Sequence, residues 1–294
     1  MKLLITGSNG LLGQKLVAGC QKNGILFHGI SSGENRNSDC LESHFTSIDI
    51  SDFIAIDDFL NHHSFSHIIH TAAMTNVDAC ELNPTRCYEV NHIASRHLFE
   101  LAKKNNIHFT LLSSDFVFDG KTGNYSETDK PNPLSVYGKS KWLAEQELLK
   151  DDYTNWAIAR TIIVYGQGHN LNKGNIFTWL ISELSAGREV SLITDHFRAP
   201  TWAEDLAEAC LRIVAKQAKG IYHLSGPETL SIFDIGIRVA NYLGVSESLI
   251  KASDSKLLNQ AAPRPPRTGF NLAKAKMELD YSPHPIEETL DYLH

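Results

Sequence analysis

The chain has 294 residues, of which 42% are hydrophobic and 21% are charged, a balance that excludes wholesale disorder and fits a soluble protein of one large or two smaller domains. Its 27 Lys and Arg against 34 Asp and Glu give a formal net charge of −7. This charge excludes a global basic field that would attract nucleic acid or an anionic membrane, and no apolar stretch is long enough to predict a signal peptide or a membrane span.

Short apolar runs alternate with helical patterns through the first half of the chain. The first run, KLLIT, is typical of a buried parallel strand, and a glycine turn and a helical pattern follow it. The predicted strands lie at 2–6, 25–30, 67–73, 108–114 and within 155–166, and the predicted helices include 12–23 and 91–104. Repeated strand, helix and strand units predict right-handed crossovers, and therefore an α/β fold with a doubly wound, Rossmann-like parallel sheet.

Beyond Gly166 the pattern is less regular. Helices are predicted at 176–186 and 201–216 and a strand at 220–226, whereas the segment 261–271 is too rich in proline for a helix. We interpret this half as a smaller C-terminal lobe that is partly interleaved with the sheet domain.

The predicted domain division follows from these patterns. Residues 1–166, with 199–225 packing back onto them, form a dinucleotide-binding domain, and 167–198 with 226–294 form a substrate-binding lobe. Because ligands of open α/β sheets bind beyond the carboxyl ends of the strands, a lobe placed there would close over the ligand.

The turn after the first predicted strand, TGSNGLLG, has the spacing G-x-x-G-x-x-G. Glycine lets backbone N–H groups approach a pyrophosphate at the N-terminus of a helix. The alternative is a glycine-rich turn that binds nothing, but its place between the first strand and first helix favours dinucleotide binding. The cofactor-binding residues predicted here are Gly7, Asn9, Gly10, Leu11, Leu12 and Gly13.

The end of the second predicted strand bears on the choice of cofactor. An acidic residue there would bind the ribose 2′-hydroxyl of NAD. This chain has Ser31 and Ser32 instead, and Arg36 is nearby, so a 2′-phosphate could be accommodated. We expect NADP rather than NAD, and the alternatives are NAD or a polar loop that contacts no cofactor.

Tyr137 precedes Lys141 by four residues in a helical pattern, which places both side chains on one face. A lysine ammonium beside a phenol favours the phenolate and makes the phenol a better proton donor near neutral pH. Ser113 and Ser114 follow an apolar run and are predicted at the carboxyl end of a strand, where a hydroxyl could bond a substrate carbonyl. Each feature alone is compatible with a purely structural role, but their order along the chain points to a dehydrogenase site.

With these motifs in this order, the chain resembles an extended short-chain dehydrogenase/reductase, and most closely the dTDP-4-dehydrorhamnose reductase family. The resemblance covers nearly the whole chain. The segments that carry it are TGSNGLLGQKL, SIDISD, TAAMTNVDACELNP, SSDFVFDG, YGKSKWLAE, ARTIIVYG, KGNIF, TDHFRAPTWAEDLA, GIYHLSG and APRPPRTGFN.

The resemblance implies specific roles. Tyr137 would give a proton to the keto oxygen as hydride arrives, Lys141 would bind the nicotinamide ribose and lower the tyrosine pKa, and Ser114 would orient the carbonyl. Further cofactor contacts are implied for Asp49, Ile50, Ala72 and Ala73. Substrate contacts are implied for Thr75, Val77, Asp78, Ser114, Phe116, Tyr137, Ile163 and Arg264.

The chain departs from the family pattern near the expected sugar and diphosphate pockets. Phe116 replaces a usual tyrosine, and Ile163 stands where tryptophan is frequent. His196 and Arg198 replace a glutamine and a glycine. These changes bear on which sugar is bound and leave the residues of hydride transfer in place.

The implied function is NAD(P)H-dependent reduction of the 4-keto group of a nucleotide-activated deoxysugar, with dTDP-4-dehydro-L-rhamnose favoured as the substrate in dTDP-rhamnose biosynthesis. One alternative is a reductase or epimerase for a different nucleotide sugar. Another is a non-catalytic, NADP-binding regulatory subunit similar to the β subunit of methionine adenosyltransferase. Beyond the nucleotide sugar, we expect no nucleic-acid or membrane partner, and a homodimer stays open.

Several other features favour structural interpretations. Five scattered cysteines without a Cys-x-x-Cys pair indicate a reduced, cytoplasmic protein rather than a disulfide framework or zinc site. His63 and His67 have the helical spacing of metal ligands, but their segment passes from a helix end to a strand, so no metal site is predicted. Arg264 and Arg267 could clamp a diphosphate or lie on a solvated loop, and Arg160 could equally be structural.

Overall fold

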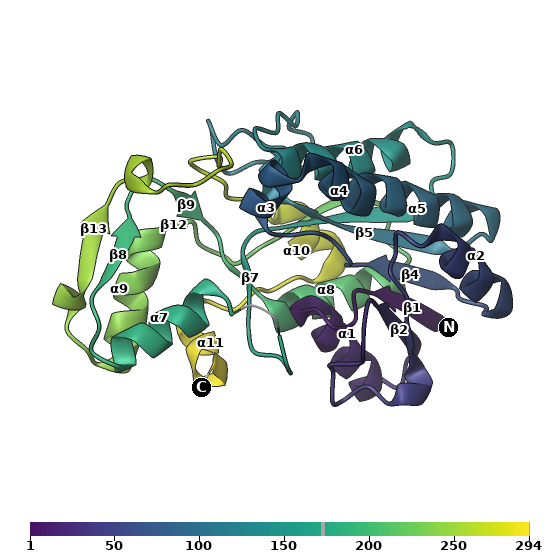
Figure 1. Cartoon of the computed structure of the whole chain (residues 1–294), viewed down its shortest axis with the longest axis horizontal. Helices are drawn as coiled ribbons and strands as arrows, with labels where there is room; N and C mark the ends of the chain where they lie inside the picture. The colour runs from purple at the N-terminus through teal and green to yellow at the C-terminus, as the bar shows by residue number, and fades with distance from the viewer. Residues whose placement is uncertain (172–173, 294) are drawn as a thin grey trace.

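A parallel sheet of seven strands forms the centre of the larger part of the molecule (Figure 1). The structure is a computed structural model and describes residues 1–171 and 174–293. The strand order is β11-β6-β5-β4-β1-β2-β3, so the direction of winding reverses beside β1 and leaves a crevice at the carboxyl ends of the strands. The strand bounds are β1 Lys2–Thr6, β2 Leu26–Ser31, β3 Phe45–Ser47, β4 His67–His70, β5 His108–Ser114, β6 Trp156–Thr161 and β11 Gly220–Leu224. The predicted doubly wound fold is confirmed.

Helices cover both faces of this sheet. Leu3 and Ile5 of β1 pack in the cluster that contains α1 and α8, whereas Leu4 packs in the cluster that contains α2, α5 and α6. Alternate residues of a parallel strand therefore meet apolar helices on opposite sides, which is why the strand sequences are almost continuously hydrophobic. The bounds are α1 Leu11–Lys22, α8 Ala203–Lys216, α10 Ala273–Leu279, α2 Phe53–His62, α5 Ala94–Lys104 and α6 Val136–Lys150.

A second, smaller cluster of apolar side chains lies at the other end of the molecule (Figure 1). Its strands β8 and β13 pair in parallel beside α7 and α9, with α11 completing the cluster. Two short pairs, β7 with β10 and β9 with β12, join it to the sheet domain. The bounds are α7 Ile176–Ser185, β8 Val190–Ile193, α9 Ile232–Leu243, β13 Ile250–Ser253, α11 Ile286–Thr289, β7 Val164–Tyr165, β9 Phe197–Arg198, β10 Thr201–Trp202 and β12 Leu230–Ser231.

The structure sharpens the predicted elements. The helix predicted at 91–104 is α5 preceded by a π-helix at Glu89–Ile93, and residues 201–202 form β10 before α8 begins. Within the segment 226–294, α10 lies against β11 and α8 of the sheet domain. The domain division remains a proposal, and its residues 172, 173 and 294 lie outside the described residues. Within residues 1–171 and 174–293, no helix is both long and apolar enough to cross a membrane.

Candidate active site

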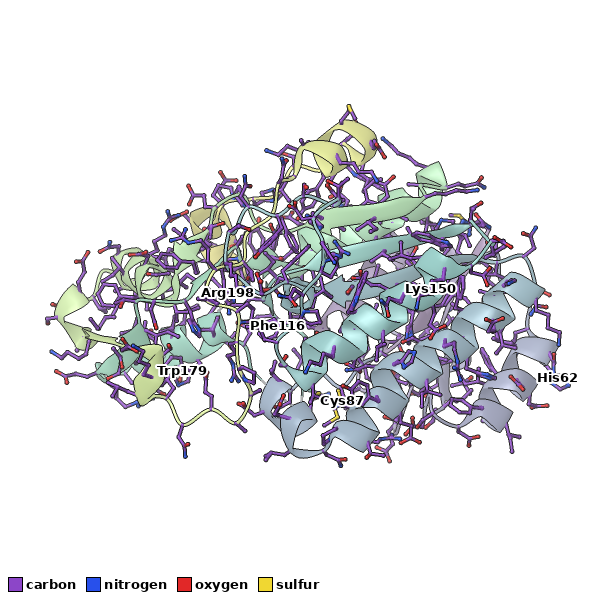
Figure 2. The ribbon with its side chains drawn as sticks, turned by 90° about the horizontal axis from the view of Figure 1, so that it is seen from above. His62, Cys87, Phe116, Lys150, Trp179 and Arg198 are labelled. Carbon is purple, nitrogen blue, oxygen red and sulfur yellow. The ribbon has the colours of Figure 1, made fainter. Side chains whose placement is uncertain are left out.

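A cleft of about 1020 Å³ opens at the carboxyl ends of the sheet strands. Residues that follow β1, β2, β4, β5 and β6 line one side of it, and Ile176, Trp179 and Ile232 of the smaller cluster line the other. Figure 2 shows Phe116 and Arg198 close together near the middle of the molecule, and Trp179 on the side of the smaller cluster. The cleft is large enough for a dinucleotide and part of a second ligand.

The glycine turn forms the floor of the sheet side of the cleft. Gly7 has φ +71°, and a Cβ at Gly13 would lie 2.2 Å from the Gly7 carbonyl oxygen, so both positions require glycine. The turn leads into α1, whose first backbone N–H groups have no intrahelical partner and favour an anion. The turn residues that line the cleft are Gly7, Gly10, Leu11, Leu12 and Gly13. These residues fit a bound pyrophosphate.

Asn9 is buried and does not line the cleft. Its side chain instead donates to the Glu34 carbonyl and accepts from the Arg36 N–H, both at 2.8 Å. Asn9 therefore joins the glycine turn to the loop after β2, which contributes Ser31, Ser32 and Arg36 to the cleft. The three residues predicted to meet a 2′-phosphate therefore all line the cleft.

The remaining predicted cofactor residues, Asp49, Ile50, Ala72 and Ala73, also line the cleft. Asp49 is not a free charge, because Arg86 lies 2.9 Å from its carboxylate. Arg86 also lines the cleft and was not predicted from the sequence. An adenine bound here would thus meet largely apolar residues and the ion pair of Asp49 with Arg86, in which the two charges neutralise each other.

Ser114, Tyr137 and Lys141 come together at the middle of the cleft. Ser135 caps the N-terminus of α6 by accepting a hydrogen bond of 3.1 Å from the Gly138 N–H, which fixes the first turn of the helix. Tyr137 and Lys141 then lie on one buried face, and Tyr137 hydrogen-bonds with Ser114. All three side chains line the cleft, so the structure assembles the predicted triad.

Burial dominates the electrostatics of this triad. It raises the pKa of the Tyr137 phenol against the effect of the Ser114 hydrogen bond, and the Asp115 carboxylate raises it further. Burial also lowers the pKa of Lys141 to about 8, and Glu145 opposes that shift. Lys141 was expected to lower the tyrosine pKa, but in the protein alone the desolvation of the phenol outweighs any such effect.

The predicted substrate residues fall into two groups. Thr75, Val77, Phe116, Ile163 and Arg264 line the cleft. Asp78 does not line it, but accepts two hydrogen bonds from Arg264, at 2.7 and 3.0 Å. Arg264 is therefore already paired, so a diphosphate would have to compete with Asp78 for it. Arg267 lies outside the cleft lining, over the Phe197 ring at 3.8 Å, so the two arginines do not form a joint clamp.

Ile163 has φ +34°, an unfavourable backbone conformation for a β-branched residue. The Thr201 N–H donates to the carbonyl oxygens of Ile162 and Ile163, which holds this bend beside the cleft. Strain at a ligand-facing position is typical of sites whose geometry is fixed by the surrounding structure.

Two further departures from the family pattern, His196 and Arg198, both line the cleft. The Arg198 guanidinium donates to the carbonyl oxygens of Phe197, Pro265 and Pro266. Arg198 thereby fastens the proline-rich segment to β9. Arg160 is structural, since it is buried in an ion pair of 2.6 Å with Glu145 and does not line the cleft.

Asn91 is a site residue that our sequence reasoning missed. It is fully buried in the π-helix, and its amide accepts from the Met74 N–H at 2.8 Å and donates to the Met74 carbonyl at 3.0 Å. The same amide donates to Ser140 Oγ at 3.0 Å. Asn91 thus ties the loop after β4 to α6, between Tyr137 and Lys141. A π-helix at this point is the structural signal, since such bulges gather at functional sites.

Metal ligation finds no support in the described residues. No group of three or more His, Cys, Asp or Glu side chains in residues 1–171 and 174–293 is placed to hold an ion. His63 stacks on Phe59 with ring centroids 4.4 Å apart, and His67 lies 5.4 Å from the His108 ring. These histidines belong to the packing at the amino ends of the strands.

Comparisons with known proteins agree with the fold and the motifs. The pattern of the family described as the RmlD substrate binding domain matches residues 1–293. The dTDP-4-dehydrorhamnose reductase of Aggregatibacter actinomycetemcomitans is 30% identical over 302 residues, covering 98% of this chain and 97% of that protein. A probable low-salt glycan biosynthesis reductase of Haloferax volcanii is 31% identical over 292 residues, covering 99% and 96%. The methionine adenosyltransferase 2 subunit beta of Bos taurus is 27% identical over 271 residues, covering 90% and 78%.

Solved structures show the same architecture. A hypothetical dTDP-4-dehydrorhamnose reductase from Sulfolobus tokodaii has a TM-score of 0.83 at 29% identity, covering 99% of this chain and 98% of that one. A dTDP-4-dehydrorhamnose reductase from Bacillus anthracis, solved in complex with NADP, has a TM-score of 0.85 at 23% identity, covering 99% and 97%. At this identity the second likeness shows the fold alone.

Proposed function

The chain belongs to the RmlD substrate binding domain family, as its motifs predicted, and from this premise we propose that it is an NAD(P)H-dependent reductase of nucleotide-activated 4-keto-deoxysugars. The observation that carries the proposal is the joint burial of Ser114, Tyr137 and Lys141 in a cleft that begins at the glycine turn. Within this class we propose dTDP-4-dehydro-L-rhamnose as the substrate and dTDP-L-rhamnose as the product.

Each residue of the triad has a defined task in this reaction. The nicotinamide, when bound, supplies the hydride. Tyr137 gives its phenolic proton to the keto oxygen, Ser114 holds the oxygen end of the carbonyl near that proton, and Lys141 binds the ribose beside it. Tyr137 is a buried proton donor that lines the cleft beside Ser114, so the proton that reaches the sugar comes from Tyr137.

The cofactor proposal is NADP, with NAD as the alternative. Gly7, Gly13 and the N-terminus of α1 fit the pyrophosphate, and Ser31, Ser32 and Arg36 line the cleft at the end of β2. No carboxylate follows β2 directly to bind a 2′-hydroxyl. We expect NADPH to protect the protein against heat more than NADH at equal concentration, and Arg36→Ala to remove most of that difference.

The test of the proposed function is NADPH oxidation with dTDP-4-dehydro-L-rhamnose. We expect turnover in the wild type and a loss of about 10²- to 10⁴-fold in Tyr137→Phe, since the general acid is removed. Tyr153→Phe is the matched control, because it removes a half-buried tyrosine hydroxyl that donates to the Ile107 carbonyl near the opposite end of β5. Unchanged turnover in Tyr137→Phe would contradict the assigned acid.

A second candidate is favoured by the similarity to the methionine adenosyltransferase 2 subunit beta. In that case the same cleft would bind NADP without turnover of any keto-sugar. Retained NADP binding, absent reduction of dTDP-, UDP- and GDP-linked keto-sugars, and copurification with an unrelated enzyme would select this candidate over the reductase.

A further inference from the structure

Residues 256–264, which follow β13 and which we call the strap, have no part in the mechanism above. Most of the strap is exposed, yet three of its side chains line the cleft: Leu258, Gln260 and Arg264. Figure 2 shows this pale yellow segment as a loop between the side of Trp179 and the helices near Cys87. Because the strap faces solvent on one side and the cleft on the other, it forms part of the rim of the cleft.

Both ends of the strap are fixed to their surroundings. Before the strap, Ser255 donates from its N–H and its hydroxyl to the Asp195 carboxylate, at 3.1 and 2.5 Å. After it, Arg198 of β9 donates to the carbonyl oxygens of Pro265 and Pro266, at 2.7 and 3.2 Å. Any movement is therefore confined to the residues between these two attachments.

Asp78, in the first turn of α3 (Val77–Leu82), attaches the strap to the sheet domain. Its carboxylate accepts from Arg264 Nη1 at 3.0 Å, from Arg264 Nη2 at 2.7 Å and from the Ala262 N–H at 3.0 Å. Within residues 1–171 and 174–293, each hydrogen bond that runs from the strap to the sheet domain ends on Asp78. One carboxylate thus holds the strap across the rim of the cleft.

Arg264 keeps donors for a ligand while it is paired with Asp78. A guanidinium has five N–H groups. Nη1 donates to Asp78 and to the Ala262 carbonyl, and Nη2 gives one of its two protons to Asp78. The Nε–H and the second Nη2–H meet no acceptor in the described part of the chain, and Arg264 lines the cleft. This edge of the guanidinium has the fork geometry that binds two phosphate oxygens.

We propose that Asp78 is a positioning residue that sets the affinity for the substrate, because it holds Arg264 and the strap in the free protein and releases Arg264 to the diphosphate of the entering ligand. The pair can be exchanged in this way since its side chains are partly exposed, 17% for Arg264 and 36% for Asp78, and water screens their attraction. After the exchange Asp78 keeps the Ala262 N–H. The identity of the anion rests on the proposed function, whereas the attachment of the strap does not.

Asp78→Asn tests the exchange, because it removes the charge and keeps one oxygen for the Ala262 N–H. We expect the variant to bind dTDP about fivefold more tightly than the wild type in the presence of NADPH, since Arg264 no longer has to leave a carboxylate. Isothermal titration calorimetry measures this affinity. In the reductase assay the effect should fall on KM for the nucleotide sugar, which decreases by about the same factor, rather than on kcat.

Removal of a carboxylate also favours any nearby anion, so the charge effect has to be separated from the release of Arg264. A double-mutant cycle with Arg264→Met makes that separation. If Asp78 acts through Arg264, Asp78→Asn leaves the affinity for dTDP unchanged in the Arg264→Met background, and an equal gain in both backgrounds would overturn the proposal. Glu81→Gln is the matched control on α3, because an amide oxygen can still accept from the Val136 N–H, and it should change the affinity by less than about twofold.

Hydrogen exchange measures the attachment of the strap without any ligand. We expect the peptide that spans residues 257–264 to exchange about fivefold faster in Asp78→Asn, because both charge-assisted bonds from Arg264 are lost. Unchanged exchange would refute the role of Asp78 in holding the strap. If none of dTDP, UDP and GDP binds the wild type, the proposed function and the release by a diphosphate both fail, while the exchange experiment still decides whether Asp78 holds the strap. A wild type that binds dTDP but reduces no keto-sugar would refute the reductase alone.

Discussion

At the scale of a single residue, the buried charge of Lys141 lowers the free energy of unfolding. Its side chain is 3% exposed, and its ammonium makes no hydrogen bond or ion pair with any residue in the described part of the chain. Burial lowers its pKa from 10.5 to about 8. Below pH 8 the lysine is charged in both the folded and the unfolded protein, and the folded state bears a desolvation penalty of about 3 kcal/mol.

We therefore expect Lys141→Met to stabilise the protein by about 3 kcal/mol at pH 7 while it abolishes turnover. As the pH rises from 8 to 10.5, the folded wild type loses its lysine proton before the unfolded chain does, so wild-type stability rises and the advantage of the variant shrinks. Urea unfolding of both proteins at pH 7, 8.5 and 10 measures the difference in unfolding free energy between them. Lys139→Met, an exposed lysine in the same helix, should show no such gain. A destabilised Lys141→Met at pH 7 would refute the argument.

At the scale of elements, the ends of helices offer a separate test. Gln217 ends α8 in the left-handed conformation at φ +49° and is exposed. Gly244 ends α9 in the same conformation at φ +67°, with open space where a Cβ would lie. A non-glycine residue at such a cap is strained by about 1 kcal/mol.

We expect Gln217→Gly to raise the unfolding free energy by about 0.5–1 kcal/mol, and Gly244→Ala to lower it by about 1 kcal/mol. Both changes act through backbone conformation, because the Gln217 side chain is exposed and a Cβ at Gly244 would meet open space. Thermal unfolding of the two variants and of the wild type measures both changes in stability. Shifts of the same sign would show that contacts, rather than the left-handed caps, decide stability here.

The elements also show where prediction from sequence succeeds. β1 and β5 match the predicted runs because strands buried on both faces are continuous apolar segments with clear ends. β8 and β13 were not predicted, since strands of four residues carry too little periodicity.

The site residues also fall into those that a local sequence pattern predicts and those that it does not. The glycine turn and the pair Tyr137 and Lys141 are local patterns. The ion pair of Asp78 with Arg264 joins residues 186 positions apart, and the contact of Asp115 with Thr268 joins residues 153 apart. These contacts form only when the smaller lobe packs against the sheet, so no local sequence pattern predicts them.

At the scale of the whole molecule, the central sheet carries an unusual set of buried histidines. His28, His67, His70, His108 and His223 lie on its strands. Burial lowers the pKa of His28 and His67 to about 4 and that of His70 and His223 to about 3. His67 Nε2 and His108 Nδ1 are buried without a hydrogen-bond partner among the described residues. These rings are neutral in the folded protein, and protonation would place a charge inside the sheet.

This arrangement predicts that acid destabilises the fold before carboxylates titrate. Below pH 6.5 the unfolded chain binds protons on these histidines while the folded protein does not, so stability falls as the pH falls, by up to about 1.4 kcal/mol per pH unit for each histidine. Between pH 6.5 and 5 most carboxylates stay ionised in both states, so urea unfolding in this window isolates the histidine effect. His67→Leu should make the fall shallower by up to about 1.4 kcal/mol per unit.

The exposed His62, at the far edge of the molecule in Figure 2, is the control, and His62→Leu should leave the slope unchanged. A wild type whose stability is flat across this window would mean that the sheet takes up protons without unfolding, and the neutral-histidine account of its packing would be wrong.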